Sequence, residues 1–307
     1  MDHVDVVVVG GSFAGMSAAL QLGRARQSVK LFDTKKPRNR FASTAHGFLG
    51  HDGRTPAEIR GLGRENLAKY PTLEVEETRV ASVEQEDGGF IVHVDGGAPI
   101  KASRLVLAYG LRDELPKMEG LEEAWGRNVM QCPYCHGYEV SDRRLGVLYT
   151  SEASLHQAKI IPDWSADVTL FTNGQAIDPD AIAAVKDRGV VIVEDRVIGL
   201  ELEDGWMRRV NLQEHSHVLD GLFVITKTHQ SSDLASQLGC AFEDGPFGPY
   251  IRVDNLQETS VPGVFAAGDI ARPIHQSVWA AADGSAAGAF CHQSLLNHRN
   301  PYQKPAA

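Results

Sequence analysis

Two cysteines and a histidine in the middle of the chain have the residue types and spacing for redox chemistry. The stretch MQCPYCHGYEV runs from Met130 to Val140, so Cys132 and Cys135 are separated by two residues and His136 follows directly. A short turn can bring two sulfurs at this spacing within bonding distance, so the pair could cycle between dithiol and disulfide. The pair could also hold a metal ion or form a structural disulfide. His136, with an ordinary pKa of about 6.5, could take a proton from an incoming thiol.

The number of available ligands argues against a metal site. A structural zinc ion takes four ligands, and the two other cysteines, Cys240 and Cys291, lack a partner at CxxC or HxxxH spacing. We therefore expect no metal, and we expect Cys240 and Cys291 to be buried as small apolar side chains. Four cysteines in 307 residues also do not make the dense framework of a secreted disulfide scaffold.

The first sixty residues contain elements that could position a dinucleotide. Val6–Val9 is an unbroken β-branched run, typical of a strand buried on both faces. A glycine turn and an Ala/Leu-rich segment over about 14–24 predict a helix, and VKLFD predicts a second strand ending at Asp33. Asp33 follows Gly15 at close to the spacing of about 20 residues expected for an acid that binds a ribose. The order of strand, turn, helix, strand and acid indicates a dinucleotide site.

The glycine turn is a variant of the G-x-G-x-x-G fingerprint. Gly10 and Gly15 hold the first and third glycine positions, whereas Ser12 holds the second, where the backbone comes closest to a pyrophosphate. Because serine adds only a small side chain, we expect a strained site that still binds, with the pyrophosphate on the helix N-terminus. The alternative is an ordinary tight turn. The predicted binding residues here are Gly10, Ser12, Phe13, Ala14, Gly15 and Asp33.

The rest of the chain also has an α/β pattern. Short strands are expected over 73–107, LRDELP is expected to be a linker with a boundary near Arg112, and a second α/β unit is expected over 113–228. A strand in GVFAAGD then leads to a small-residue helix over 276–296. Asp269, at the end of that strand, could hydrogen-bond sugar or ribityl hydroxyls. The small residues of the helix could equally mean only close packing.

Composition and charge exclude some classes of function. Apolar residues make up 43% of the chain and the net charge is -10, which argues against nucleic acid or an anionic membrane as a main partner. No apolar run approaches the roughly 20 residues of a membrane span, and the N-terminus has no basic leader pattern. A cytoplasmic, reducing location is therefore expected.

Three motifs in this order resemble the low-molecular-weight thioredoxin reductases: GGSFAG near the N-terminus, CPYC in the middle, and TSVPGVFAAGDI near the C-terminus. The resemblance implies an α/β fold of two Rossmann-like, three-layer ββα domains. An FAD-binding domain in two pieces, 1–112 and 229–307, would be interrupted at 113–228 by a smaller NADPH-type domain that carries the CxxC. It further implies a homodimer and FAD as the cofactor. The flavin-site residues carried over by the resemblance are Ala108, Gly110, Gly268, Asp269, His275 and Gln276.

The sequence departs from that family where NADPH would bind. The family's second glycine fingerprint is replaced by YTSEAS, from Tyr149 to Ser154, and the arginines for the 2′-phosphate are replaced by LFTNG, from Leu170 to Gly174. Side chains would occupy the space that a pyrophosphate needs, so we expect no use of NADPH. Tyr109 stands where the family shows threonine, which leaves a flavin contact there open.

The stretch CPYCHGYE, with His136 in place of the family's acid, resembles the FAD-dependent dithiol oxidases that close disulfides in natural products of the gliotoxin and holomycin type. By this resemblance Cys132 exchanges with a small-molecule dithiol, Cys135 faces the flavin, and dioxygen accepts the electrons to give hydrogen peroxide. A lowered thiol pKa is expected if Cys132 lies at a helix N-terminus.

Two other functions remain open from the sequence. The enzyme could reduce a protein disulfide with electrons from ferredoxin or NADPH, or the chain could be an FAD-binding redox sensor without turnover. His46 and His51 lie in a loop that the family places over the flavin edge, where either a substrate pocket or an ordinary polar loop would fit.

Overall fold

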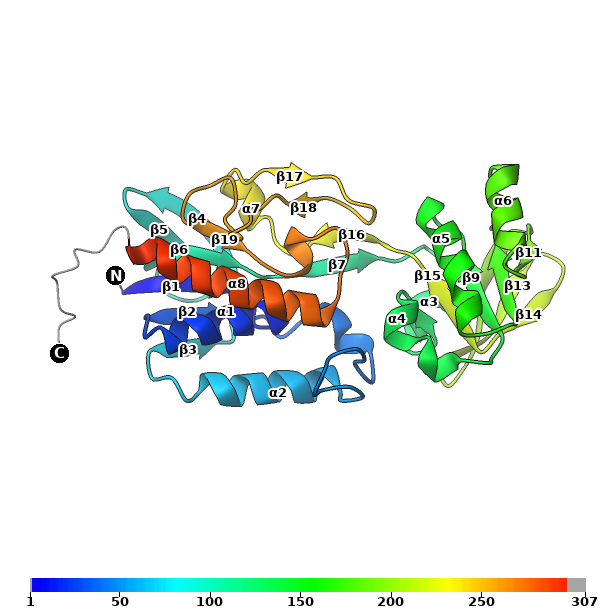
Figure 1. The fold of residues 1–307 in the computed structure, drawn as a ribbon, viewed down its shortest axis with the longest axis horizontal. Coiled ribbons are helices and arrows are strands. Elements are labelled where there is room, and N and C mark those ends of the chain that lie inside the picture. The colour runs from blue at the N-terminus through cyan, green and yellow to red at the C-terminus, as the bar shows by residue number, and fades with distance from the viewer. Residues whose placement is uncertain (1, 297–307) are drawn as a thin grey trace. The chain divides into compact units, whose positions relative to one another are not determined.

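The computed structural model describes residues 2–296, whose contacts divide them into two compact units. Within the described residues, unit 1 comprises 2–38, 57–112 and 228–296, and unit 2 comprises 39–56 and 113–227 (Figure 1). The segment 39–56 was expected in the first piece of the FAD-binding domain, 1–112. Its contacts instead group this segment with the middle unit. This difference matters because the segment carries His46.

Unit 1 is built on a mixed sheet with the strand order β3-β2-β1-β6-β5-β4, in which β19 also pairs with β6. The strands are β1 (His3–Val9), β2 (Val29–Phe32), β3 (Leu73–Glu76), β4 (Val80–Glu86), β5 (Gly89–Val94), β6 (Ile100–Leu107) and β19 (Val264–Ala266). β1 is parallel to both β2 and β6, and β19 is parallel to β6. Val6, Val7 and Val8 are 0% exposed, which confirms the predicted central strand. The carboxyl ends of these parallel strands meet at one edge, so the loops that follow them can share a site.

The helices of unit 1 cover this sheet. They are α1 (Phe13–Arg24), α2 (Pro56–Leu67), α7 (Leu234–Gln237) and α8 (Ser277–Leu296). Unit 1 also contains the 3₁₀ turn η4 (Asp269–Ala271) and the short strands β16 (Lys227–Gln230), β17 (Phe242–Glu243) and β18 (Tyr250–Ile251), whereas the 3₁₀ turn η1 (Arg38–Phe41) lies where the chain passes into unit 2. α1 and α8 run side by side (Figure 1). A β-carbon on Gly284 would lie 2.0 Å from the Ala14 carbonyl oxygen, and one on Gly288 would lie 2.5 Å from that of Ala18. Close packing of two helices therefore explains the small residues of α8.

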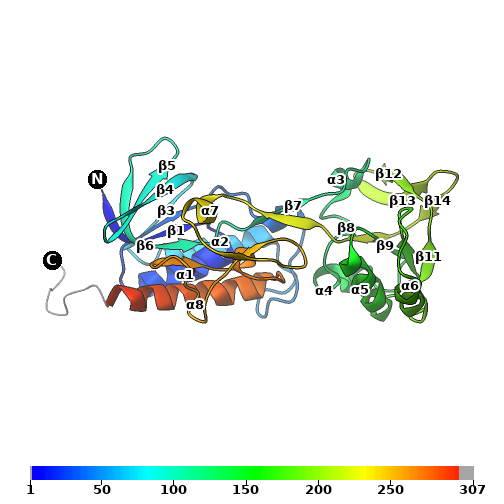
Figure 2. The same cartoon turned by 90° about the horizontal axis from the view of Figure 1, so that it is seen from above.

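Unit 2 has three layers. Its elements are β7 (Leu111–Glu114), α3 (Leu121–Ala124), β8 (Val129–Met130), α4 (Pro133–His136), η2 (Tyr138–Val140), β9 (Leu145–Leu148), α5 (Glu152–Ile160), η3 (Ile161–Asp163), β10 (Val168–Phe171), α6 (Pro179–Lys186), β11 (Val191–Val193), β12 (Val197–Glu203), β13 (Trp206–Leu212), β14 (Ser216–Val218) and β15 (Gly221–Val224). A parallel sheet in the order β11-β10-β9-β15-β8 lies between α5 and α6 on one face and the antiparallel β12-β13-β14 on the other (Figure 2). The predicted ββα architecture is confirmed.

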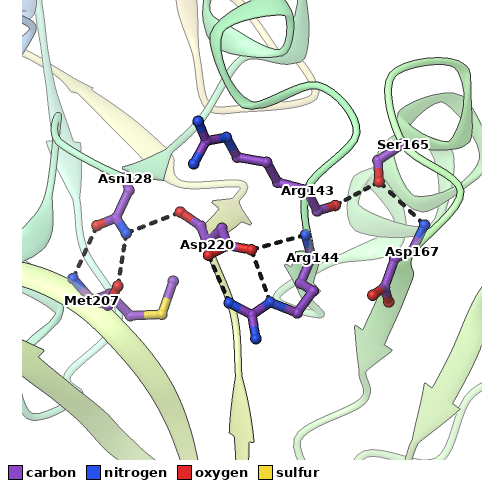
Figure 3. Close-up of polar contacts among 7 residues, drawn as sticks. All are labelled: Asn128, Arg143, Arg144, Ser165, Asp167, Met207 and Asp220. Atoms are coloured by element: carbon purple, nitrogen blue, oxygen red, sulfur yellow. Dashed lines mark hydrogen bonds and ion pairs between the residues drawn. The ribbon is translucent and has the colours of Figure 1, made fainter.

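A polar network ties together the amino ends of the central strands of unit 2 (Figure 3). Arg144 donates from Nε and Nη2 to the two carboxylate oxygens of Asp220, each at 2.9 Å, and so holds the pKa of that carboxyl below its ordinary value. The Asn128 side chain, in a residue only 5% exposed, donates to the carbonyl oxygens of Met207 and Asp220. The network stabilises the edge of the sheet opposite its carboxyl ends.

One local prediction was wrong. The segment LRDELP, expected to be a linker, begins with strand β7, which forms a two-stranded sheet with β16. Leu111 is 4% exposed, and the Asp113 carboxylate accepts a hydrogen bond of 2.7 Å from the Thr226 hydroxyl. Three consecutive charged residues, Arg112, Asp113 and Glu114, give this strand the composition of a linker. Within residues 2–296, no helix is long and apolar enough to cross a membrane.

Candidate redox site and cofactor site

The cysteine pair lies on a single helical turn of unit 2. Cys132 is the N-cap residue of α4, with φ −112° and ψ 116°, and Pro133 starts the helix with a φ that suits this position. The Cys135 N–H donates to the Cys132 carbonyl oxygen at 3.2 Å, and both cysteines are half-buried. Cys132 thus has the predicted place at a helix N-terminus. The helix is only four residues long, so few peptide dipoles are aligned behind it.

His136 ends α4 in a half-buried position. Burial lowers the pKa of its imidazole, the Glu139 carboxylate raises it, and His46 lowers it. An imidazole whose pKa is held below the ordinary value is neutral at neutral pH, so it can accept a proton. The predicted role of His136 as a base is consistent with this environment.

The His46 side chain lies beside the redox segment. Its Nε2 lies 3.3 Å from Glu139 Oε1 and 3.1 Å from the Thr44 hydroxyl, and its Nδ1 lies 3.6 Å from Asp52 Oδ1. The His51 ring instead packs edge-on against Phe48, with the ring centroids 5.3 Å apart. The two histidines that the sequence left open therefore have different surroundings, and only His46 is paired with a residue of the CxxC segment.

Aromatic side chains surround the same turn. Tyr134, between the two cysteines, is 67% exposed and meets Trp164 edge-on with centroids 5.4 Å apart. A β-carbon on Gly137 would lie 2.5 Å from the Pro133 carbonyl oxygen and 3.1 Å from the Trp164 ring. Glycine at 137 is therefore required by packing, a constraint that the sequence pattern alone did not reveal.

In unit 1, the glycine turn after β1 packs tightly against the end of β6. Gly10 has φ +108°, and a β-carbon there would lie 2.2 Å from the Ala108 carbonyl oxygen. A β-carbon on Gly15 would lie 1.7 Å from the Gly10 carbonyl oxygen. Gly10, Gly15 and Ala108 are thus brought together at the carboxyl edge of the sheet, where the turn leads directly into α1.

The backbone of Ser12 is in an ordinary conformation. This residue is the N-cap of α1, with φ −100° and ψ −159°, an extended conformation that any residue adopts. Its hydroxyl makes no capping hydrogen bond, and the first turn of α1 has no acidic residue. The first N–H groups of a helix have no partner within the helix, and the Ser12 side chain does not cap them, so an anion such as a pyrophosphate could bind at this N-terminus.

The second part of the predicted cofactor site lies around the start of η4 and α8. A β-carbon on Gly268 would lie 2.9 Å from the Ala14 β-carbon, which brings the two halves of the motif together. Arg38 was missed by the sequence analysis: its Nη1 lies 3.2 Å from Asp269 Oδ2 and 2.8 Å from His275 Nδ1. Because a guanidinium can only donate, His275 Nδ1 is the acceptor. No motif marks Arg38, which acts across more than 200 positions in sequence.

Asp33 lies at the carboxyl end of β2, as predicted, and is 7% exposed. Its carboxylate accepts from Arg64 Nη2 at 2.7 Å and from the Lys35 N–H at 3.1 Å. A β-carbon on Gly11 would lie 2.6 Å from the Asp33 β-carbon, so the acid packs directly under the turn. Arg64 is a further residue that sequence reasoning missed. The carboxylate keeps lone pairs for ribose hydroxyls.

The remaining predicted residues lie close to these elements. Phe13 is the first residue of α1 and is buried. The Gln276 carbonyl oxygen accepts from the Ala280 N–H at 2.9 Å, and Gly110 has φ +73° just after β6.

The Tyr109 side chain packs against the apolar core of unit 1, and burial raises the pKa of its phenol. Cys240 and Cys291 are 6% and 0% exposed, which confirms that they are buried.

The N-terminus of α5, where the family's second fingerprint would lie, is closed by its own side chains. The Ser154 hydroxyl accepts from the N–H groups of Thr150 at 3.1 Å and Ser151 at 3.4 Å. The Glu152 carboxylate stands at the first helical position and accepts from the hydroxyl of Tyr149, a residue 8% exposed, at 2.9 Å. The N–H groups of Thr150 and Ser151 are thus already hydrogen-bonded, and a carboxylate in the first turn disfavours a second anion at this N-terminus.

The loop after β10 is also changed. The Asn173 side-chain oxygen accepts from the Val197 N–H at 3.0 Å, and the Gly174 N–H donates to the Glu194 carbonyl oxygen at 3.0 Å. The loop thus packs against an acidic segment. Arg196 follows that segment, and its Cα would lie 4.0 Å from a β-carbon on Gly174. Arg196 is a cation that reading LFTNG alone did not find.

The two sites fit one class of protein. α1 offers an open, uncharged N-terminus with a buried acid at the end of β2, as an FAD pyrophosphate and ribose require, and unit 2 supplies a CxxC. These are the parts of a flavin-dependent disulfide oxidoreductase of the thioredoxin reductase type.

Comparisons with known proteins agree with this class. The chain is 44% identical to an oxidoreductase from Agrobacterium tumefaciens, with a TM-score of 0.92 over 97% of this chain and 100% of that one. It is 39% identical to HlmI, with a TM-score of 0.90 over 96% and 93% of the two chains. It is also 30% identical over 303 residues to thioredoxin reductase sirT of Leptosphaeria maculans, with 92% of each chain covered.

The pyridine nucleotide-disulphide oxidoreductase family model matches residues 4–285, and the chain belongs to that family. It is therefore a disulfide oxidoreductase of the thioredoxin reductase-like type. Proteins of this family are FAD-binding flavoproteins, so FAD is the cofactor.

Proposed function

We propose that this enzyme oxidises a small-molecule dithiol to an intramolecular disulfide, with dioxygen as the final electron acceptor. The observation that carries the proposal is the closed N-terminus of α5, where Ser154 and Glu152 take the place of a nicotinamide dinucleotide. An enzyme of this type without an NADPH site must receive its electrons elsewhere, and a dithiol that attacks the Cys132–Cys135 disulfide can supply them.

The chain's own residues account for the thiol chemistry. His136 takes the proton of the first substrate thiol, and the thiolate attacks Cys132. A bond forms between the substrate sulfur and Cys132 Sγ, the Cys132–Cys135 bond breaks, and the electron pair stays on Cys135 Sγ. The second substrate thiol then attacks the mixed disulfide, so the substrate leaves as a disulfide and the enzyme pair is left reduced by two electrons.

The cofactor would be held by unit 1. The α1 N-terminus, beginning with Ser12, would bind the pyrophosphate, Asp33 would bind the adenosine ribose, and Asp269, positioned by Arg38, would bind ribityl hydroxyls. When bound, FAD would supply a two-electron acceptor for the reduced cysteine pair and a route for these electrons to dioxygen, with hydrogen peroxide as the product. Cys135 is the cysteine that we assign to the flavin side, on the resemblance to thioredoxin reductases.

A test compares two reductants. The FAD-loaded protein is mixed with dithiothreitol or with NADPH, first without oxygen to follow flavin bleaching and then in air to follow hydrogen peroxide. We expect bleaching and peroxide with dithiothreitol and not with NADPH. Rapid bleaching by NADPH would overturn the proposal, and so would failure of dithiothreitol to bleach the flavin, which would favour a protein donor or a sensor.

Matched cysteine variants connect this reaction to the pair. Cys135→Ser should keep FAD and lose dithiol-driven bleaching by at least about a thousandfold, the scale of removing a catalytic nucleophile. Cys240→Ala, a change at a buried cysteine of unit 1, should retain the reaction. Unchanged turnover in Cys135→Ser would remove the pair from the mechanism.

A further inference from the structure

Three ionisable side chains from two distant segments of the chain meet in unit 2. His136 ends α4, Glu139 lies in η2 three residues later, and His46 comes from the segment 39–56. His46 Nε2 lies 3.3 Å from Glu139 Oε1, and its Nδ1 lies 3.6 Å from Asp52 Oδ1. The His46 side chain is 18% exposed, whereas those of Glu139 and Asp52 are 39% and 68% exposed. The His46 ring thus lies between the Glu139 and Asp52 carboxylates and is more buried than either.

The backbone carries Glu139 on the turn that follows His136. Gly137, between them, packs against the Pro133 carbonyl oxygen and the Trp164 ring. The Gly137 N–H donates to that carbonyl at 2.6 Å, and the Val140 N–H donates to the Gly137 carbonyl at 3.3 Å. Glu139 is therefore carried on the same tight turn as the histidine.

The loop that carries His46 is held as well. The Ala45 N–H donates to the Arg54 carbonyl oxygen at 2.8 Å, and the Gly47 N–H donates to the Asp52 carboxylate at 2.8 Å. These bonds close the loop on both sides of His46 and fix the acid that faces its Nδ1. The contact between His46 and Glu139 is thus between two ordered segments.

These neighbours have opposite effects on a proton at His136. A carboxylate at Glu139 stabilises an imidazolium there, and a positive charge at His46 destabilises it. Asp52 Oδ1 and Glu139 Oε1 face the two ring nitrogens of His46, at 3.6 and 3.3 Å. The other groups on the same helical turn are the two cysteines and the exposed Tyr134.

We propose that Glu139 and His46 are positioning residues for the proton transfer from the dithiol: Glu139 stabilises the imidazolium that forms on His136, and His46 holds Glu139 and limits that stabilisation. The inference rests on the proposed dithiol oxidation for its substrate. The proton moves from the substrate thiol to His136, and the electron pair of the S–H bond stays on the attacking sulfur.

The proposal makes opposite predictions for two variants. The bleaching rate with dithiothreitol should rise with pH as His136 loses its proton, because only the neutral imidazole accepts the thiol proton. We call this rise the limb of the pH–rate profile. Glu139→Gln removes a charge that raises the pKa of His136, so the limb should move to lower pH. His46→Gln removes a charge that lowers it, so the limb should move to higher pH. Shifts of a few tenths to about one pH unit are expected for charges at such distances.

Matched controls exclude a general loss of structure. His156→Gln and Glu123→Gln change the same residue types at exposed positions elsewhere in unit 2 and should leave the limb in place. Glu139→Asp keeps the charge and should restore most of the wild-type profile. In His136→Gln the limb should vanish, and adding Glu139→Gln or His46→Gln should then shift nothing.

A titration of the His136 ring by NMR separates the two proposals, because it needs no turnover. The ring signal, assigned by its loss in His136→Gln, should titrate at lower pH in Glu139→Gln and at higher pH in His46→Gln. Equal titration in all three proteins, or shifts of the same sign, would overturn the inference even if dithiothreitol bleaches the flavin. If the ring shifts as expected but no dithiol is oxidised, the proposed function fails and the charge coupling stands.

Discussion

The helices α1 and α5 each follow a strand of a parallel sheet, and each begins where a dinucleotide pyrophosphate would bind in its fold. At α1 the N-cap hydroxyl makes no capping bond, the first turn has no acid, and the turn before it is built from glycines. At α5 the Ser154 hydroxyl takes two backbone donors, Glu152 places a carboxylate at the first position, and Tyr149 fills the turn.

The difference shows that the same strand–helix arrangement can carry a helix N-terminus with or without a capping side chain. The strand before α5 remains fully buried, with Leu145, Val147 and Leu148 at 1% exposure or less. The fold depends on the packing of the helix against the sheet. It does not depend on whether a ligand or the helix's own side chains accept hydrogen bonds at the helix N-terminus.

The largest expected effect is at Gly15. Gly15→Ala would place a β-carbon 1.7 Å from the Gly10 carbonyl oxygen, so the turn and α1 must separate. We expect a loss of about 2 kcal/mol or more in the free energy of unfolding, as for overpacked cores, together with loss of FAD. Thermal unfolding of the apoprotein and FAD fluorescence titration measure the two effects.

The control for Gly15 is Gly61 in α2, where a β-carbon would have no atom within 4 Å. Gly61→Ala should stabilise the protein by about 0.5–1 kcal/mol, because alanine restricts the unfolded chain more than glycine. If Gly15→Ala retained FAD at wild-type affinity, the close packing of the turn would not be what opens the α1 site.

A carboxylate at the start of α1 should make this N-terminus resemble that of α5. Aspartate is a favourable N-cap, so Ser12→Asp should not lower the stability of the apoprotein. The charge would oppose a pyrophosphate, and we expect FAD to bind about tenfold or more weakly, which corresponds to about 1.4 kcal/mol. Ser12→Gly, the usual fingerprint residue, should bind FAD as the wild type does. Equal FAD affinity in Ser12→Asp would show that the pyrophosphate does not rest on α1.

The reverse change tests whether α5 is closed by its side chains. The double variant Glu152→Gln, Ser154→Gly frees the N–H groups of Thr150 and Ser151 and removes the carboxylate. We expect a loss of about 1 kcal/mol of stability, the usual effect of losing a cap, and weak binding of NADPH by calorimetry where the wild type shows none. Tyr149 should still keep the affinity low. Tight binding of NADPH to the wild-type protein would contradict the comparison.

The smallest effect is expected far from both helix starts, at Asp220. Arg144 lowers the pKa of Asp220, so the pair stabilises the protein above the ordinary carboxyl pKa and loses this contribution as the pH falls through the lowered pKa. Asp220→Asn should lower the Tm by about 1–3 °C near neutral pH and by nothing in strong acid. FAD affinity and dithiol-driven bleaching should not change. An effect on either would show that the difference between α1 and α5 is not local.

Local patterns made part of the structure predictable. The β-branched run, glycine turn and Ala-rich helix of the first βαβ unit each involve neighbours in sequence, and they predicted β1, α1 and β2 to within a few residues. The same holds for the long helix α8. β7 was missed because a four-residue strand with three consecutive charged residues has the composition of a linker.

The candidate site divides in the same way. Cys132, Cys135 and His136 could be identified because their chemistry depends on spacing along one turn. Arg38, Arg64 and His46 could not, because each acts on a partner from another segment: Asp269, Asp33 and Glu139. No pattern within a window of sequence encodes such a contact.

The sequence by itself determined the α/β class, the redox pair, the place of the dinucleotide turn and the loss of glycines before α5. Those features depend on residue type and spacing, which the chain carries locally. The extended backbone of Ser12, the capping of α5 by Ser154 and the contact of His46 with Glu139 became visible only in the folded chain. Packing brings together residues that are far apart in sequence. It therefore sets the backbone conformation, the hydrogen-bond partners and the distances between charges.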